Sequence, residues 1–258
     1  MTLSCMQFAV VFFFGLLFGS FLTVCVYRIP RELSIVFPRS ACLHCEQTIP
    51  WYDNIPVLSF LLLRGRCRQC QAPILPRYPL IELSNALGYM AILWRFGWTW
   101  ESLIYAIFFS ALLVITWIDW DHQIIPDVIS LPGILLGVLA ASTVLPTGLL
   151  NSIVGILVGG GVLLFMAWLS PYLFGKEGLG GGDIKLLAMV GAFLGWQAAL
   201  TTLMFASIVG SILGIILLSC KIVKRGQYIP FGPYLALGAI ISLFWGPALT
   251  DWYFGRFL

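Results

Sequence analysis

Charged residues are scarce in this sequence. Lys, Arg, Asp and Glu together make up 10% of the 258 residues, and there are only two histidines. Because a soluble globular protein carries about 25% charged residues, a water-soluble fold of this size would lack the side chains to cover its surface. Hydrophobic residues reach 60%, which excludes a disordered chain, a collagen-like fibre and a small disulfide-stapled secreted domain. The composition predicts a multispanning membrane protein.

Long apolar runs account for most of the chain. A membrane-spanning helix needs about 20 mostly apolar residues. We therefore predict an all-α polytopic membrane protein with about eight transmembrane helices. The first is interpreted as a retained helix, residues 1–26 forming one unit, because no basic residue precedes the run and no A-x-A-like cleavage site follows it. The candidate spans are 7–26, 79–97, 102–118, 128–145, 150–173, 184–197, 199–220 and 232–250.

A polar loop, residues 27–78, separates the first two predicted spans. It holds ten of the 25 charged residues (14 basic plus 11 acidic), and seven of these ten are arginines. Since Lys and Arg are enriched in cytoplasmic loops, this loop is predicted to be cytoplasmic and both termini to lie on the opposite side. The same topology puts Lys176, Lys185, Lys221, Lys224 and Arg225 inside and leaves Arg95 and Arg256 outside. Residues 79–258 are predicted to form a membrane helical bundle.

The polar loop contains two CxxC pairs, Cys42-Leu43-His44-Cys45 and Cys67-Arg68-Gln69-Cys70, with 21 residues between the inner cysteines. Two such knuckles can supply four thiolates to a tetrahedral, structural zinc ion. The alternative is two disulfides, which a reducing cytoplasm disfavours. We predict a small zinc-ribbon-like module with Zn²⁺ bound by Cys42, Cys45, Cys67 and Cys70. No internal repeat with a clear period is expected in the chain.

Two aspartates fall at predicted cytoplasmic span ends, Asp119 in Trp117–Asp127 and Asp183 after three glycines, residues 180–182. Carboxylates at membrane depth are costly and are functional candidates by default. Two carboxyl groups about 3 Å apart cannot both ionise easily, so one holds a proton while the other activates water. Asp121 and Asp127 compete with Asp119, although Asp121 points to another helix face and Asp127 suits the N-cap of the next span. A solvated helix end is the alternative interpretation for each.

Further short motifs follow one another along nearly the whole chain. They are Gly19-Ser20-Phe21-Leu22-Thr23-Val24, Tyr27-Arg28-Ile29-Pro30, Asn54-Ile55-Pro56-Val57-Leu58-Ser59 and Arg77-Tyr78-Pro79-Leu80-Ile81-Glu82. With the CxxC pairs and the two aspartate segments, they resemble the type IV prepilin peptidases, also called bifunctional prepilin leader peptidase/N-methyltransferases. The Gly-Lys pair often found before the third cysteine is Gly65-Arg66 here, which keeps the positive charge but not the ammonium geometry.

The resemblance implies a GxGD-type aspartic protease of the bacterial inner membrane, with Asp119 and Asp183 as catalytic residues. Such enzymes remove the basic leader of type IV prepilins or type II secretion pseudopilins after a glycine at the cytoplasmic face. Many then methylate the new N-terminal residue with S-adenosylmethionine, a reaction associated with the cysteine loop. The residues that would contact this methyl donor cannot be placed from the sequence. The expected partners are these substrates and the lipid bilayer, with no nucleic acid.

Two charged residues have both a functional and a structural interpretation. Glu82 could assist methylation, or it could be a carboxylate stabilised by the helix dipole at the start of a span. Lys185 could pair with a carboxylate or a lipid headgroup, or extend its ammonium group to the interface. For the whole chain, the alternatives are a leader peptidase without methyltransferase activity and a transporter or proton channel that uses the carboxylates as a relay. The cysteine loop and the motif order favour the peptidase.

Overall fold

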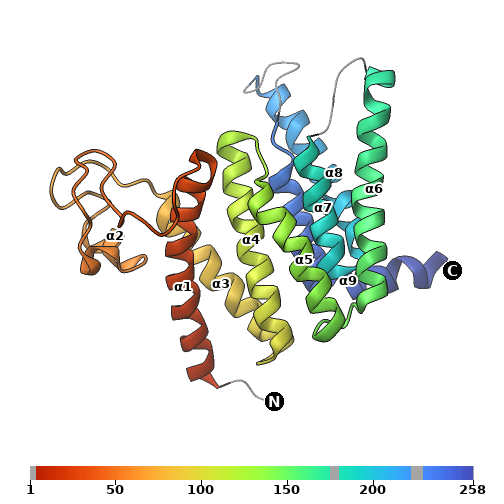
Figure 1. The fold of residues 1–258 in the computed structure, drawn as a ribbon, viewed down its shortest axis with the longest axis horizontal. Helices are drawn as coiled ribbons and strands as arrows, with labels where there is room; N and C mark the ends of the chain where they lie inside the picture. The colour runs from red at the N-terminus through yellow and green to blue at the C-terminus, as the bar shows by residue number, and fades with distance from the viewer. Residues whose placement is uncertain (1–3, 175–179, 222–228, 258) are drawn as a thin grey trace. The chain divides into compact units, whose positions relative to one another are not determined.

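The computed structural model describes residues 4–174, 180–221 and 229–257, and helices are the only extended regular elements of these residues. The all-α prediction is therefore confirmed for them. Two short 3₁₀ helices, η1 (Ile29–Arg31) and η2 (Trp51–Asn54), and the five-residue α2 (Leu58–Leu62) lie in the polar loop. The long helices are α1 (Cys5–Arg28), α3 (Arg77–Phe96), α4 (Trp100–His122), α5 (Asp127–Thr143), α6 (Leu149–Phe174), α7 (Gly181–Leu194), α8 (Trp196–Ser219) and α9 (Gly232–Phe257) (Figure 1).

The chain divides into two compact units, Met1–Val114 and Ile115–Leu258. In the first, α1 packs against α3 at glycines that leave no room for a side chain. A Cβ atom at Gly19 would lie 2.6 Å from the Cα atom of Glu82. Next to this contact, the amide of buried Asn85 donates to the carbonyl of Gly15 at 2.8 Å and accepts from the hydroxyl of Ser110 at 2.9 Å. Close backbone approach and satisfied polar groups are how helices associate in lipid.

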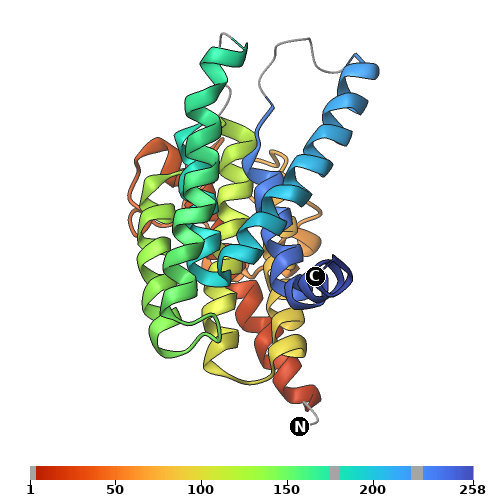
Figure 2. The same cartoon turned by 90° about the vertical axis from the view of Figure 1, so that its right-hand side faces the viewer.

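In the second unit, α7 is the central helix. It contacts α5, α6, α8 and α9, and both views show it among these helices (Figure 1, Figure 2). Nine of its fourteen residues are buried. Glycines again permit the packing: the backbones of Gly155 on α6 and Gly191 on α7 touch, and a Cβ atom at Gly159 would lie 2.7 Å from the carbonyl oxygen of Leu187. This burial fixes the start of α7, where Asp183 lies.

Each predicted span corresponds to one long helix, but only four helices of the described residues are long and apolar enough to cross a membrane by length and composition. These four are Cys5–Arg31, Trp100–His122, Leu149–Tyr172 and Trp196–Ser219. The predicted span 184–197 runs past the end of α7 into α8. Gly195, with a φ of 86°, separates α7 from α8. At 1.5 Å per residue the fourteen residues of α7 reach about 21 Å, less than the roughly 30 Å of a bilayer core.

Candidate functional site

Asp119 lies near the C-terminal end of α4 and is almost completely buried, with 3% of its surface exposed. Its Oδ2 atom accepts a hydrogen bond of 2.9 Å from the backbone N–H of Gly232, the first residue of α9. A Cβ atom at Gly232 would lie only 2.7 Å from Oδ2 of Asp119. The absence of a side chain at this position therefore lets the backbone of α9 reach the carboxylate.

Asp183 lies in the first turn of α7 and is 4% exposed. A carboxylate in the first turn is favoured by the partial positive charge of the helix N-terminus. Gly180 is the N-cap, and its carbonyl accepts from the N–H of Asp183 at 3.1 Å. At Gly182 a Cβ atom would approach the Cβ of Ile125 to 2.8 Å, whereas at Gly181 it would meet nothing within 4 Å. Gly182 thus allows the segment after α4 to pack against the start of α7, whereas the space beside Gly181 is open.

The two predicted aspartates come together in the second unit although they are 64 positions apart along the chain (183 − 119). Their carboxylates are close enough for the charge of Asp119 to act on Asp183. Two buried carboxyl groups in mutual electrostatic range favour a state in which one is ionised and the other protonated. Such a pair can both remove a proton from water and supply one to a leaving group.

The two alternative candidates for the pair, Asp121 and Asp127, are exposed, whereas Asp119 is buried. Asp121 is exposed, two residues beyond buried Asp119 on the same helix. Asp127 is also exposed, and both of its oxygens accept from the Nζ atom of Lys185 at 2.7 Å. The predicted N-cap role of Asp127 is wrong, because α5 begins at Asp127 itself and Pro126 occupies the N-cap position. For Lys185, pairing with a carboxylate is the interpretation that the structure supports.

The four cysteines of the polar loop form one cluster. Their Sγ atoms all lie within 4.8 Å of one another, and those of Cys42 and Cys70 are 3.7 Å apart. Four sulfurs bound at about 2.3 Å around a tetrahedral zinc lie about 3.8 Å from one another, whereas a disulfide joins its sulfurs at about 2.05 Å. The donor set and its spacing therefore fit a metal ion such as zinc, and all four thiols are free.

Backbone hydrogen bonds act on the thiol of Cys42 within the cluster. Hydrogen bonds from the backbone of Cys45 and His44 lower the pKa of the Cys42 thiol to about 6, whereas desolvation and the neighbouring cysteine thiols raise the pKa of Cys70 to about 11. The lowered pKa of Cys42 favours the thiolate, which is the form that binds metals. His44 supplies its contact to Cys42 through its main chain and is not part of the four-sulfur cluster.

The two knuckles repeat the same fold with an offset of 25 residues. In the first, the N–H of Cys42 donates to Gln47 and the N–H of Glu46 donates to Cys42; in the second, Cys67, Ala72 and Gln71 make the equivalent bonds. Isolated antiparallel bridges, Ala41 with Thr48 and Arg66 with Pro73, close both turns. This local similarity of two turns leaves standing the expectation that the sequence has no repeat with a clear period. The shared pattern is in backbone bonds, and outside the cysteines the two sequences differ.

Glu82 is buried in α3, with 7% of its surface exposed. Its Oε2 atom accepts from the backbone N–H of Val57 in the polar loop at 2.7 Å. The loop and this helix are therefore joined at a buried carboxylate. Sequence reasoning named Glu82 but missed its partner, because a backbone N–H carries no signature in the residue type. It also missed Gly232 for the same reason, although the prolines on each side, Pro230 and Pro233, indicate a restricted backbone there.

Lys176, Lys224 and Arg225 lie outside the described residues. The arginine-rich loop is described, and the guanidinium of Arg28 donates to the carbonyls of Ser34 and Pro38 where the loop leaves α1. This contact orders the start of the loop.

Comparisons with known proteins agree with the resemblance found in the motifs. The bacterial peptidase A24 N-terminal domain matches residues 13–96, and the type IV leader peptidase family matches residues 106–215. The chain is 39% identical over 281 residues to a prepilin leader peptidase/N-methyltransferase of Aeromonas hydrophila, covering 98% of this chain and 96% of that protein. A protein of the same name from Pseudomonas aeruginosa is 41% identical over 264 residues, covering 93% and 90%.

A further relative with this name, from Legionella pneumophila, is 34% identical over 279 residues, which covers 98% of this chain and 96% of the relative. No solved structure matches the chain. The matches extend over both compact units and include both aspartate segments. The chain therefore belongs to the prepilin leader peptidase/N-methyltransferase family.

Proposed function

We propose that this protein removes the leader peptide of type IV prepilins or type II secretion pseudopilins and then methylates the new N-terminus. Asp119 and Asp183 are the catalytic residues of the cleavage. The observation that carries this proposal is the buried pair itself: two carboxylates from distant segments lie within electrostatic range, at the end of α4 and the start of α7. Family membership supports the same activity.

The geometry suggests separate roles for the two acids. The N–H of Gly232 stabilises negative charge on Oδ2 of Asp119, so Asp119 acts as the base. It takes a proton from water as the water oxygen attacks the carbonyl carbon of the scissile bond. Asp183, held in a buried first turn, carries the proton that the carbonyl oxygen receives. When the intermediate collapses, the proton on Asp119 passes to the leaving amine, one hydroxyl proton of the intermediate returns to Asp183, and the peptide bond breaks.

The location of the cut follows from the proposed topology. All eight long helices cross or enter the inner membrane, and the polar loop faces the cytoplasm because it carries seven of the fourteen Lys and Arg residues. A prepilin's apolar helix would lie among the helices while its basic leader stays in the cytosol. The scissile bond, after a glycine, would then lie at the interface near the aspartates. The open space beside Gly181 leaves room for an extended backbone there.

For methyl transfer we propose that the polar loop is the relevant part. Cys42, Cys45, Cys67 and Cys70 would hold a Zn²⁺ ion, which would have a structural role because four protein ligands close its coordination. S-adenosylmethionine, when bound, supplies the methyl group. The described residues show no group of donors that can be assigned to it, and we assign no residues to its binding.

Co-expression with a prepilin tests the cleavage. Asp119→Asn and Asp183→Asn should each abolish leader removal while the protein remains in the membrane, because neither amide can exchange a proton as a carboxyl group does. Asp127→Asn is the matched control, since this aspartate is exposed and paired with Lys185. Mass spectrometry of the mature N-terminus then shows whether the methyl group is added, which separates the full activity from cleavage alone. Normal cleavage by either dyad variant contradicts the assignment, and ion flux without cleavage points to a transporter.

A further inference from the structure

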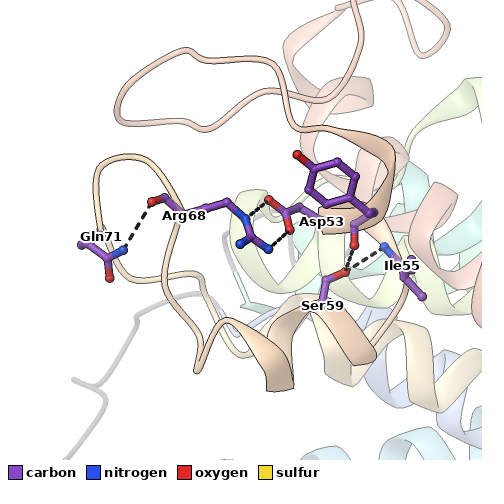
Figure 3. A network of polar contacts seen from close by, with 6 residues as sticks. Asp53, Ile55, Ser59, Arg68 and Gln71 are labelled. Atoms are coloured by element: carbon purple, nitrogen blue, oxygen red, sulfur yellow. Dashed lines mark hydrogen bonds and ion pairs between the residues drawn. The ribbon is translucent and has the colours of Figure 1, made fainter.

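An ion pair ties the second knuckle to the segment that follows the first. Arg68 lies between the cysteines Cys67 and Cys70, and its guanidinium makes two parallel bonds to Asp53, with Nε–Oδ2 at 2.7 Å and Nη2–Oδ1 at 2.6 Å (Figure 3). The side chain of Asp53 is only 6% exposed, whereas that of Arg68 is 55% exposed. These hydrogen bonds hold the pKa of Asp53 below its usual value. A bidentate pair of this kind fixes orientation as well as distance.

From Asp53 the ordered contacts continue to α2. Asp53 belongs to η2, and the Oγ atom of Ser59, the second residue of α2, donates to the carbonyl of Tyr52 in η2 at 3.0 Å. The same Oγ accepts from the N–H of Ile55 at 3.0 Å. Ser59 is 6% exposed, and Figure 3 shows it between the two backbone groups. A single buried hydroxyl thus closes the turn that contains Val57.

Val57 has a backbone conformation that is unusual for its residue type. Its φ of 61° and ψ of −48° lie in a region that β-branched residues rarely adopt. Such strain persists only where surrounding contacts impose it, and it is concentrated at functional sites. Here the strained turn directs the N–H of Val57 to Oε2 of buried Glu82. The contacts from Arg68 through Asp53 and Ser59 therefore end at a carboxylate in α3.

We propose that Arg68 and Asp53 are positioning residues for methyl transfer, coupling the four-cysteine cluster to Glu82 through the turn at Val57. The inference rests on the proposed methyltransferase activity. When the four thiolates hold their metal, the knuckle that carries Arg68 is fixed, Asp53 keeps η2 in place, and Val57 keeps its bond to Glu82. All of these residues lie in the unit Met1–Val114, whereas Asp119 and Asp183 lie in the other unit. We therefore expect leader cleavage to be independent of the pair.

Hydrogen exchange of the purified, zinc-loaded full chain tests the coupling without any substrate. Chelation should accelerate exchange of the peptide that contains Val57 by about tenfold or more, because local opening then exposes this amide. Arg68→Gln and Asp53→Asn should accelerate it to a similar extent while zinc remains bound, and chelation should add little in these variants. Arg66→Gln is the matched control, since it removes the charge of an exposed neighbouring arginine and leaves the Arg68–Asp53 pair in place. Arg68→Lys should resemble Arg68→Gln, because an ammonium group cannot form the two parallel bonds.

The same variants are then assayed with a prepilin. Arg68→Gln and Asp53→Asn should lower methylation of the cleaved N-terminus about tenfold, with cleavage within about twofold of wild type. The coupling is refuted if hydrogen exchange of the Val57 amide is unchanged in both variants. It is also refuted if Arg66→Gln accelerates this exchange as much as they do. Loss of zinc from both variants also overturns it, because the pair would then serve only the metal site. Since exchange is measured without substrate, a wild-type protein that fails to cleave or methylate refutes the proposed function separately.

Discussion

Replacement of Gly232 by alanine tests how closely the start of α9 must approach Asp119. The new Cβ atom would lie 2.7 Å from Oδ2 and 3.0 Å from Cγ of Asp119, closer than van der Waals contact allows. The carboxylate must therefore move away, and the 2.9 Å bond from the N–H of Gly232 is weakened or lost. A hydrogen bond to a charged group contributes about 1.5–3 kcal/mol. Because 1.36 kcal/mol corresponds to tenfold in rate, kcat/KM for leader cleavage should fall by about 10- to 150-fold.

The assay is cleavage of a purified prepilin by detergent-solubilised enzyme, with thermal unfolding measured in parallel. Gly161→Ala is the control, since a Cβ atom there meets nothing within 4 Å and cleavage should stay at the wild-type rate. If Gly232→Ala cleaves at the wild-type rate with unchanged thermal stability, then the bond from Gly232 to Asp119 has no role in the reaction. The assignment of Asp119 as the base would then lose its structural support.

Three further predictions concern the rest of the molecule. Cys45→Ser should lower the bound zinc from about one ion per chain, measured by metal analysis, because three sulfurs leave the tetrahedral site incomplete; full retention would exclude this site. Lys185→Met should lower the free energy of unfolding by less than about 1 kcal/mol, since the pair with Asp127 is exposed, and a larger loss in thermal denaturation would contradict this. Gly191→Ala should destabilise the protein by about 1–3 kcal/mol or more, because its backbone touches that of Gly155; an unchanged melting temperature would show that α6 and α7 can separate at no cost.

Features that depend on composition and on long apolar runs could be predicted from the sequence. Lipid penalises polar side chains, so the helical segments are visible as apolar runs, and Asp119 and Asp183 are conspicuous because they interrupt them. The cysteine cluster was equally accessible, since two CxxC pairs restrict their thiolates to few arrangements. The end of α7 was harder to predict. Gly195 continues an apolar stretch, and only its positive φ shows that it ends the helix.

Contacts made by the backbone could not be predicted in this way. The N–H groups of Gly232 and Val57 bind Asp119 and Glu82, but every residue except proline carries an N–H, so residue type does not identify the donor. The ion pair of Arg68 with Asp53 joins residues fifteen positions apart in a loop whose helices are only three to five residues long. Its geometry depends on how the knuckle folds, which hydrophobic periodicity does not describe.

The 25-residue offset between the knuckles has a consequence for biosynthesis. At about 5–20 residues per second, the ribosome releases the second pair of thiols roughly 1–5 s after the first. During that interval the nascent chain presents only Cys42 and Cys45, half of a coordination sphere. Because α3 follows the second knuckle directly, the full set of four thiols leaves the ribosome just before that helix. A metal held by all four thiols, as proposed, would therefore make correct assembly of this unit depend on the metal supply during synthesis.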